Sequence, residues 1–521
     1  MASKGMITAK LQVLQGSRET DTDLSHNFGI VTIQAGKCGV RHESLGLGFN
    51  VDRSASMETR AEDGRSKIEH AKYTLTRMVS YLSEKEMGSC GIRVGVNTFD
   101  HENKPLTRRS NASSPAENNM WFPLDSEASR DELLRGIGSI ETRGSTNIGG
   151  ACGLMKRKLD GVAQGGEHWA HVLLTDGHPN VGEKSAPGIL AECPTDVDNY
   201  FVGYGADHNG ALLQKLASLA GGEYHFVESY ENAGMVYGEI LHGILFKAVH
   251  DVSLAVEGAE LYDFRENKWT NRLPLPSLAS EQSRTYHFRF PWDSKDALRI
   301  VCEYKETNSD EVACVRRTSF PYSSTATARR EARNLEVHKY WYRQQTLELL
   351  HACQRLCATH GYSAEFQEAA RLLRNHLSEF LERMKAFMKK NNLDDDAFMM
   401  KLADDVYVSH ESVGREHGYK FVTSRQTSQG DERAYAACNL GSLGCGGIWC
   451  GAAGDVAPRP VPLSRNTAGG CGNLATAPPA PSLNHQMSQD VTTCYGLPEQ
   501  VSLMRAVTRH SSDKKKEAET L

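Results

Sequence analysis

The sequence predicts an α/β fold with a doubly wound, mostly parallel sheet, followed by an antiparallel β-sandwich and a helical C-terminal region. Three observations support this prediction. Apolar runs typical of buried strands alternate with helical periodicity over about residues 41–247. Strand patterns separated by polar turns replace the helical periodicity from about residue 248, and helical periodicity returns after about residue 323.

The α/β part is defined by its strands and by the helices between them. Alternation of this kind places helices on both faces of a parallel sheet. Apolar residues spaced for one helical face follow the first strand, and glycines end a later helix. The expected strands are 45–52, 91–99, 120–124, 168–176, 198–205 and 224–227, and the expected helices are 68–82, 128–139, 147–161, 211–222 and 229–247.

The β-sandwich is predicted from two separate parts of the chain. Five antiparallel strands are expected between residues 248 and 322, which is too few for a closed sandwich. The strand-like segments 7–14 and 28–34 would complete it. We therefore assign residues 1–40 and 248–322 to the sandwich, with the α/β domain, residues 41–247, inserted between them.

The rest of the chain divides into a helical region, residues 323–422, and a tail, residues 423–521. An apolar stripe indicates a packed bundle, and its members are Leu373, Leu377, Phe380, Met384 and Phe387. Glycine, alanine, proline and serine dominate the tail, which predicts a disordered, low-complexity segment. Residues 499–509 have apolar side chains at helical spacing. We interpret them as an apolar stretch without a partner, with folding against a partner groove as the alternative.

The composition excludes several classes of function. The net charge of -6, with both signs mixed, gives no basic surface for nucleic acid or anionic membranes. No apolar run approaches the roughly 20 residues of a membrane span, and the first residues lack the apolar region of a secretion signal. The 13 cysteines are odd in number and scattered, which is typical of reduced thiols. We expect a cytoplasmic protein.

Oxygen-bearing side chains occur in three loops of the α/β part, two at strand ends and one just before a helix. They are Asp52, Ser54 and Ser56 in "DRSAS", Thr146 in "GSTNIG", and Asp176 in "LLTDG". The carboxyl ends of parallel strands meet at one edge of a sheet, so these side chains should lie together. Two carboxylates and three hydroxyls suit Mg²⁺. We expect an extended backbone to point the first three side chains the same way, with Arg53 and Ala55 pointing away. A simple serine-rich turn is the alternative.

These three motifs, in this order and on these elements, resemble a von Willebrand factor type A domain with a metal-ion-dependent adhesion site over about residues 41–247. The resemblance implies a Mg²⁺ or Mn²⁺ ion held directly by Ser54, Ser56 and Thr146, with Asp52 and Asp176 often acting through water. It also implies that a partner protein supplies an Asp or Glu carboxylate to the last coordination position. The chain is then a non-enzymatic, metal-dependent protein-interaction module.

Other functions are weighed against this interpretation. A metal-dependent hydrolase would need a general base, for which His178 is the nearest candidate. Some type A domain proteins with a β-domain are RING ubiquitin ligases, but the tail cysteines form no C-x₂-C pairs, so only a RING-less adaptor is considered. Cys353, Cys357 and His360 share one helical face; we interpret the cysteines as buried apolar residues, with zinc ligation as the alternative.

Overall fold

The structure is a computed structural model of the chain, and it describes most of the three expected regions. The described residues are 6–14, 26–39, 44–60, 64–83, 91–108, 120–162, 167–205, 208–220, 222–227, 233–292, 294, 296–307, 309, 311–319, 327–359, 363–415, 418–434 and 494–508.

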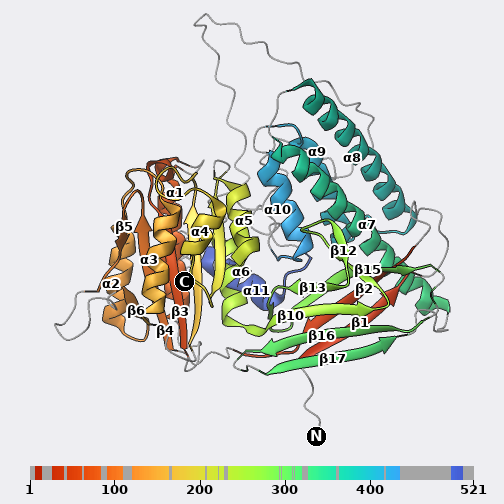
Figure 1. Ribbon diagram of the computed structural model, residues 1–521, viewed down its shortest axis with the longest axis horizontal. Coiled ribbons are helices and arrows are strands. Elements are labelled where there is room, and N and C mark those ends of the chain that lie inside the picture. The colour runs from red at the N-terminus through yellow and green to blue at the C-terminus, as the bar shows by residue number, and fades with distance from the viewer. Residues whose placement is uncertain are drawn as a thin grey trace, which may run out of the picture.

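A seven-stranded sheet forms the centre of an α/β body, residues 44–245 (Figure 1). Its order is β5-β4-β3-β7-β8-β9, with β6 paired to β4. The run from β4 to β9 is parallel, whereas β5 and β6 pair antiparallel with β4. The strands are β3 (Ser44–Asp52), β4 (Gly91–Phe99), β5 (Asn103–Pro105), β6 (Trp121–Pro123), β7 (His168–Thr175), β8 (Asp198–Tyr204) and β9 (Glu223–Val227).

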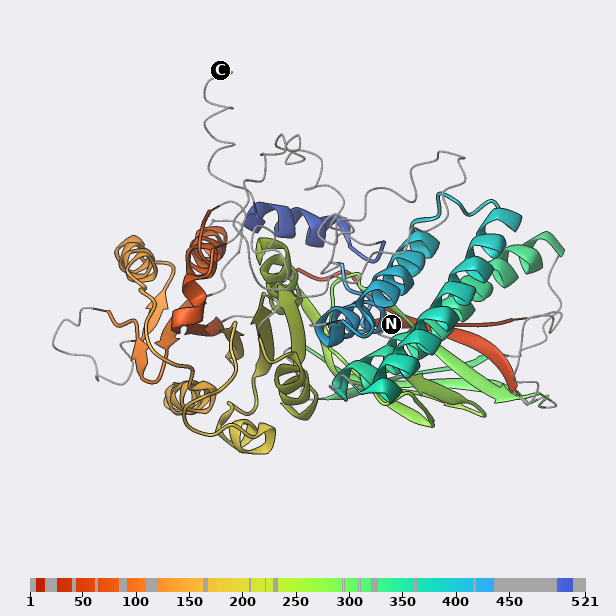
Figure 2. The ribbon, with the colours of Figure 1, turned by 90° about the horizontal axis from the view of Figure 1, so that it is seen from above.

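Helices cover both faces of this sheet, which confirms the doubly wound prediction (Figure 2). One face carries α1 (Lys67–Leu82), α2 (Glu127–Gly138) and α6 (Ala233–Leu245). The other carries α3 (Ile148–Asp160), α4 (Ala186–Glu192) and α5 (Gly210–Ala220). The sequence analysis missed α4, which is too short to show helical periodicity.

Local sequence explains the strand and helix that precede the candidate site. Strand β3 has no exposed position, because it lies in the middle of the sheet with helices on both sides. Gly46 lets Trp169 lie against the strand, since a Cβ there would be 1.9 Å from Trp169 Cε3. Helix α1 begins with a capping box, in which Ser66 and Glu69 satisfy each other's backbone N–H groups.

Two antiparallel sheets form the β-sandwich and share one apolar core. The first has the order β1-β2-β15-β11-β12, and the second β13-β10-β16-β17 with β14 on β10. Because β2 pairs with β15, the N-terminal strands belong to the first sheet of the sandwich, and the α/β body lies in the chain between β2 and β10. The short strands β12, β13 and β14 were not predicted. The strands are β1 (Ile7–Val13), β2 (His26–Ala35), β10 (Lys247–Glu257), β11 (Glu260–Asp263), β12 (Lys268–Thr270), β13 (Arg272–Leu275), β14 (Leu278–Ala279), β15 (Ser283–Pro291), β16 (Leu298–Glu306) and β17 (Val312–Ser319).

Four helices form a bundle beside the first sheet. They are α7 (Thr327–Ala358), α8 (Ala364–Lys390), α9 (Ala397–Ser412) and α10 (Gly418–Gly430). Helix α7 packs against β1 and β2 of that sheet. Phe28 and Ile30 of β2 belong to the apolar core of this bundle. In the predicted stripe, Leu377, Phe380 and Met384 are buried, and Leu373 and Phe387 are partly buried. No helix within the described ranges combines the length and apolar character that a membrane crossing requires.

Folded structure continues beyond residue 423, where we expected a disordered tail to begin. Helix α10 runs to Gly430, and buried residues continue to Ala434. The reason is polar pairing that composition does not reveal. Arg425 Nη1 lies 2.7 Å from a carboxylate oxygen of both Asp404 and Asp405. A segment of low hydrophobicity is therefore buried because its charges are paired.

A further helix, α11 (Pro498–Thr508), lies within the expected tail and packs on α6 and α1 of the α/β body (Figure 1). Leu503, Met504 and Val507 are buried in the core of that body. The apolar stretch is thus covered within its own chain, so neither sequence alternative was correct. A glycine of α6 permits the close approach, since a Cβ on Gly238 would lie 2.4 Å from Met504 Cα.

We expect Gly238→Ala to loosen α11, because the added methyl group would meet the backbone of that helix. Such overpacking costs about 1–3 kcal/mol, against a gain of about 1 kcal/mol in helix propensity. Gly243→Ala is the matched control: a Cβ at Gly243 in the same helix meets only Tyr200 Oη, at 3.9 Å. Hydrogen exchange of residues 498–508 should speed up in the first variant only. Equal exchange in both variants would contradict this packing.

Candidate metal centre

The candidate site lies where the connections of the central sheet diverge. Strand β3 pairs in parallel with β4 on one side and with β7 on the other. The chain goes from β3 to β4 and later returns to β7, so the two connections leave on opposite sides of the sheet. Asp52 ends β3 and Asp176 follows the last residue of β7, with Val51 opposite Leu174. Both aspartates therefore lie at a switch point, the usual ligand position in such sheets.

The backbone after Asp52 turns instead of remaining extended. A 3₁₀ turn occupies Ala55–Glu58, and the N–H of Ser54 donates to Asp52 Oδ1 at 2.8 Å. An aspartate that accepts from the backbone two residues later makes a side-chain turn. The expected extended backbone, with side chains on alternate faces, was therefore wrong. The Oγ atoms of Ser54 and Ser56 nevertheless lie 3.1 Å apart. The turn brings the hydroxyls together.

Asp176 and Thr146 reach the same place from two other loops. Ser56 Oγ donates to Asp176 Oδ1 at 2.7 Å. Gly177 marks the meeting point: a Cβ there would lie 3.2 Å from Thr146 Oγ1 and 3.9 Å from Ser56 Oγ. Three loops therefore bring their oxygen atoms to one position, and glycine at residue 177 keeps that position open.

Backbone hydrogen bonds hold these loops to one another. The N–H of Ala55 donates to the Gly144 carbonyl at 3.2 Å, and the N–H of Arg143 to the Arg53 carbonyl at 2.7 Å. In the third loop, the N–H of Asn180 donates to the Thr146 carbonyl at 3.1 Å, and Asn180 Oδ1 accepts from the N–H of Thr146 at 2.8 Å. The oxygen atoms are consequently fixed by main-chain contacts before any ligand arrives.

Asp52 lies deepest in this group. It has no exposed surface and accepts a hydrogen bond from Thr175 Oγ1 at 2.5 Å. Burial raises the pKa of Asp52 to about 7, although the hydrogen bonds from Thr175 and Ser54 act to lower it. Much of the Asp52 population is therefore protonated near neutral pH. A nearby divalent cation would favour the carboxylate.

Lys67 is a residue that the sequence analysis missed. Its Nζ lies 2.7 Å from Asp176 Oδ2, and both side chains are buried. Lys67 is the first residue of α1, directly after the Ser66 cap. The available signal was a lysine beside Ile68, at the start of an apolar helical face, where a solvated charge is not expected.

Arg53 points away from the hydroxyls, as expected, and joins a second charged cluster. Its guanidinium lies 2.8 Å from Asp100 Oδ2, and Arg143 pairs with Asp100 at 2.8 Å and with Glu102 at 2.5 Å. Asp100, His101 and Glu102 are close enough together to hold a metal ion. However, arginines already occupy both carboxylates, so this cluster is better explained as a network of ion pairs.

Residues 47–238 match the von Willebrand factor type A domain family. The chain contains a von Willebrand factor type A domain. Domains of this family are generally protein-interaction modules. Three loops of this type A domain carry the predicted site residues, in the order that the sequence analysis gave.

Solved structures with a similar arrangement include other type A proteins. A von Willebrand factor type A protein from Catenulispora acidiphila is 15% identical, with 80% of this chain and 89% of that chain covered and a TM-score of 0.47. The ArnB paralog VWA2 from Sulfolobus acidocaldarius is 13% identical, with 82% and 99% covered and a TM-score of 0.44. Proximal thread matrix protein 1 from the mussel byssus, with a zinc-occupied MIDAS motif, is 17% identical, with 40% and 47% covered and a TM-score of 0.29. Comparison with curated proteins gave no match.

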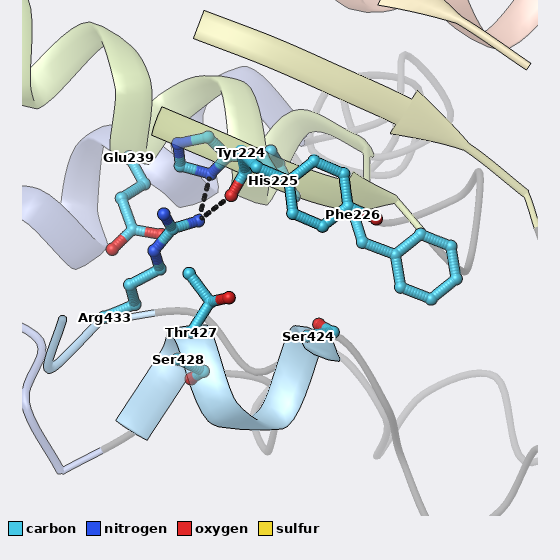
Figure 3. A pocket seen from close by; sticks show the side chains of 9 residues that line it. Tyr224, His225, Phe226, Glu239, Ser424, Thr427, Ser428 and Arg433 are labelled. Atoms are coloured by element: carbon cyan, nitrogen blue, oxygen red, sulfur yellow. Dashed lines mark hydrogen bonds between the residues drawn. The ribbon is translucent and has the colours of Figure 1, made fainter. Parts of the chain in front are cut away.

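A small cavity lies between the type A domain and the helical region (Figure 3). Its volume is about 20 Å³, which suits a single water molecule and no organic substrate. Arg433 crosses it to donate to the Tyr224 carbonyl at 2.7 Å, and it lies 3.0 Å from His225 Nδ1 (Figure 3). Glu239 accepts from the N–H of Ala434 at 2.8 Å. The side chains around this cavity therefore connect the type A domain to the segment that follows α10.

The remaining candidates are only partly described. Cys353 and Cys357 are buried in the core of the helical bundle, and burial raises the pKa of both thiols. This supports their interpretation as apolar residues; His360, the proposed third zinc ligand, lies outside the described residues. His178, considered as a general base, is exposed two residues after Asp176. Of the tail cysteines, only Cys494 lies in the described part.

We expect Asp52→Asn to stabilise the metal-free protein at alkaline pH. The pKa of Asp52 is raised from 3.8 to about 7, so its contribution to folding stability is complete below about pH 4 and is lost as the pH rises through about 7. The wild type should lose roughly 1 kcal/mol more than the variant between about pH 6 and about pH 8. Urea unfolding in EDTA measures the free energy of unfolding of the wild type and of the variant at each pH. Other titrating groups, Glu239 among them, are common to both proteins. Parallel pH profiles would show that Asp52 does not titrate in this range.

Proposed function

We propose that the type A domain is a metal-dependent protein-interaction module. Asp52, Ser54, Ser56, Thr146 and Asp176 would hold Mg²⁺ or Mn²⁺, and the ion would bind an Asp or Glu side chain of a partner protein. The observation that carries this proposal is the convergence of Thr146 Oγ1 and Ser56 Oγ at Gly177, together with the bond from Ser56 to Asp176 and two fully buried carboxylates.

The donor set fits a hard divalent cation. Hydroxyl and carboxylate oxygens are the ligands that Mg²⁺ and Mn²⁺ prefer, and Mg²⁺ is seldom held by protein groups alone. Burial alone makes the ionised form of Asp52 unfavourable, and a cation would relieve that cost. A position open to a further ligand follows from the glycine at 177, which leaves space beside the hydroxyls of Thr146 and Ser56.

The residues have distinct roles in this proposal. Ser54, Ser56 and Thr146 would supply neutral hydroxyl oxygens, and the buried Asp52 would act behind them through its hydrogen bonds. With few charged groups in direct contact, the cation would remain a strong receptor for an incoming carboxylate. The ion's contribution is this attraction for anionic oxygen, while the protein contributes a fixed arrangement of oxygen atoms. Absence of enzyme activity and a cytoplasmic location stay predictions.

Metal binding is tested by thermal unfolding with and without Mn²⁺. A ligand at a hundredfold excess over its Kd adds about 2.7 kcal/mol of stability. Thr146→Val removes the hydroxyl at nearly constant shape, and we expect it to reduce Mn²⁺ affinity at least about tenfold. Thr142→Val is the control from the same loop, because that hydroxyl donates to Glu58 at 2.8 Å and to none of the five candidate ligands. Equal Mn²⁺ stabilisation of all three proteins would refute the assignment of Thr146.

Partner capture is tested by affinity purification in Mg²⁺ and in EDTA. Proteins that bind through the centre should be retained by the wild type and by Thr142→Val in Mg²⁺. They should be lost from Thr146→Val and from every sample in EDTA. The carboxylate is then identified by replacing Asp and Glu residues of the captured protein with Asn and Gln. Partners retained equally under all conditions would contradict metal-dependent capture.

A further inference from the structure

Lys67 lies against the candidate metal centre, on the far side of Asp176 from the hydroxyls. Its Nζ is 2.7 Å from Asp176 Oδ2, and the two side chains are 1% and 0% exposed. Ser56 Oγ donates to the other oxygen of the same carboxylate at 2.7 Å. One carboxylate thus connects a buried ammonium with the group of hydroxyls. The centre therefore contains a cation of its own.

The position of this lysine is unfavourable by ordinary rules. Lysine is almost never fully buried unless it is paired. Lys67 is also the first residue of α1, where the positive end of the helix dipole disfavours a cation. Residues that break such rules are often found at functional sites. The ion pair with Asp176 stabilises Lys67 here and fixes a positive charge beside the candidate metal centre.

Lys67 changes the net charge of the candidate centre. Asp52 and Asp176 carry two negative charges when ionised, and Lys67 carries one positive charge. The neighbouring cluster adds no net charge, because Arg53 and Arg143 are matched by Asp100 and Glu102. With a divalent cation, the centre would carry a charge of about +1 by this sum; without Lys67 it would be neutral. A centre of net positive charge attracts an anion.

We propose that Lys67 determines the ligand specificity of the centre, by making the metal-loaded site a receptor for carboxylates in preference to neutral groups. This inference rests on the proposed function. It also has a consequence of opposite sign. The same ammonium repels the metal ion, so Lys67 weakens metal binding while it strengthens binding of the carboxylate. A residue with only a structural role would not move these two affinities in opposite directions.

The experiment uses the full chain, with Mn²⁺ as the metal and acetate as the carboxylate probe. Mn²⁺ affinity is measured by titration calorimetry in acetate and in chloride buffers of equal ionic strength. If acetate binds the loaded centre, it raises the apparent Mn²⁺ affinity, and the ratio of the two values measures the coupling. Acetamide, a neutral molecule of similar shape, is the control ligand.

Two neutral variants test the charge. Lys67→Gln keeps a hydrogen-bond donor for Asp176, and Lys67→Met keeps most of the apolar stem. Lys67→Arg retains the positive charge. Lys72→Met is the matched control on the same helix, because Lys72 Nζ donates to the Ile140 carbonyl at 2.9 Å and is not paired with Asp176.

We expect Lys67→Gln and Lys67→Met to bind Mn²⁺ about tenfold or more tightly, and to lose most of the acetate coupling. Lys67→Arg and Lys72→Met should keep the coupling of the wild type. Weaker Mn²⁺ binding or unchanged acetate coupling in the folded neutral variants overturns the inference alone. If neither neutral variant folds, loss of coupling in Lys67→Arg overturns it. A wild type that binds no Mn²⁺ overturns the proposed function and this inference together.

Discussion

Parallel pairing of β3 with both β4 and β7 determines where every group of the candidate centre lies. The register that sets Val51 opposite Leu174 brings the ends of two strands together, so Asp52 and Asp176 meet at one edge of the sheet. A shift by one residue would turn the side chains of β3 to the opposite face. Loops alone could not fix these positions. The buried strand fixes the two aspartates, and main-chain hydrogen bonds between the loops hold the backbone of Ser54, Ser56 and Thr146 in place beside them.

The centre is less favourable for folding than an apolar equivalent would be. Two fully buried aspartates and a fully buried lysine need pairing, and burial raises the pKa of Asp52 to about 7. The large apolar core of the type A domain tolerates this cost, and Leu503 and Met504 of α11 extend that core from far along the chain. The group that is costly in the free protein is the same group that would gain from a cation. In the proposed function, Asp52 therefore lowers the stability of the metal-free protein and strengthens metal binding.

Much of the architecture could be predicted because its periodicities are strong. The strands of the α/β body are apolar over most of their length. The two N-terminal strands were assigned to the sandwich because its five other predicted strands were too few to close it. The candidate residues could be chosen from the sequence because Asp52 and Asp176 lie at the ends of recognisable strands and Thr146 lies just before a recognisable helix. The extended backbone at Ser56 was wrong because a local turn, closed by Asp52, competes with the strand. Lys67 and α11 were missed for a different reason: Lys67 depends on a partner 109 residues away, and α11 on glycines of α6.

Anomalous scattering from a crystal of the full chain grown with Mn²⁺ would locate the ion without reference to any activity. If the three hydroxyls bind the ion, a peak should lie within ligand distance, about 2.0–2.2 Å, of oxygen atoms from Ser54, Ser56 and Thr146. At a Mn²⁺ concentration that half-saturates the wild type, the peak should be much weaker in Thr146→Val. A peak at Asp100 and Glu102 instead, or none near the three hydroxyls at saturating Mn²⁺, would contradict binding by these hydroxyls.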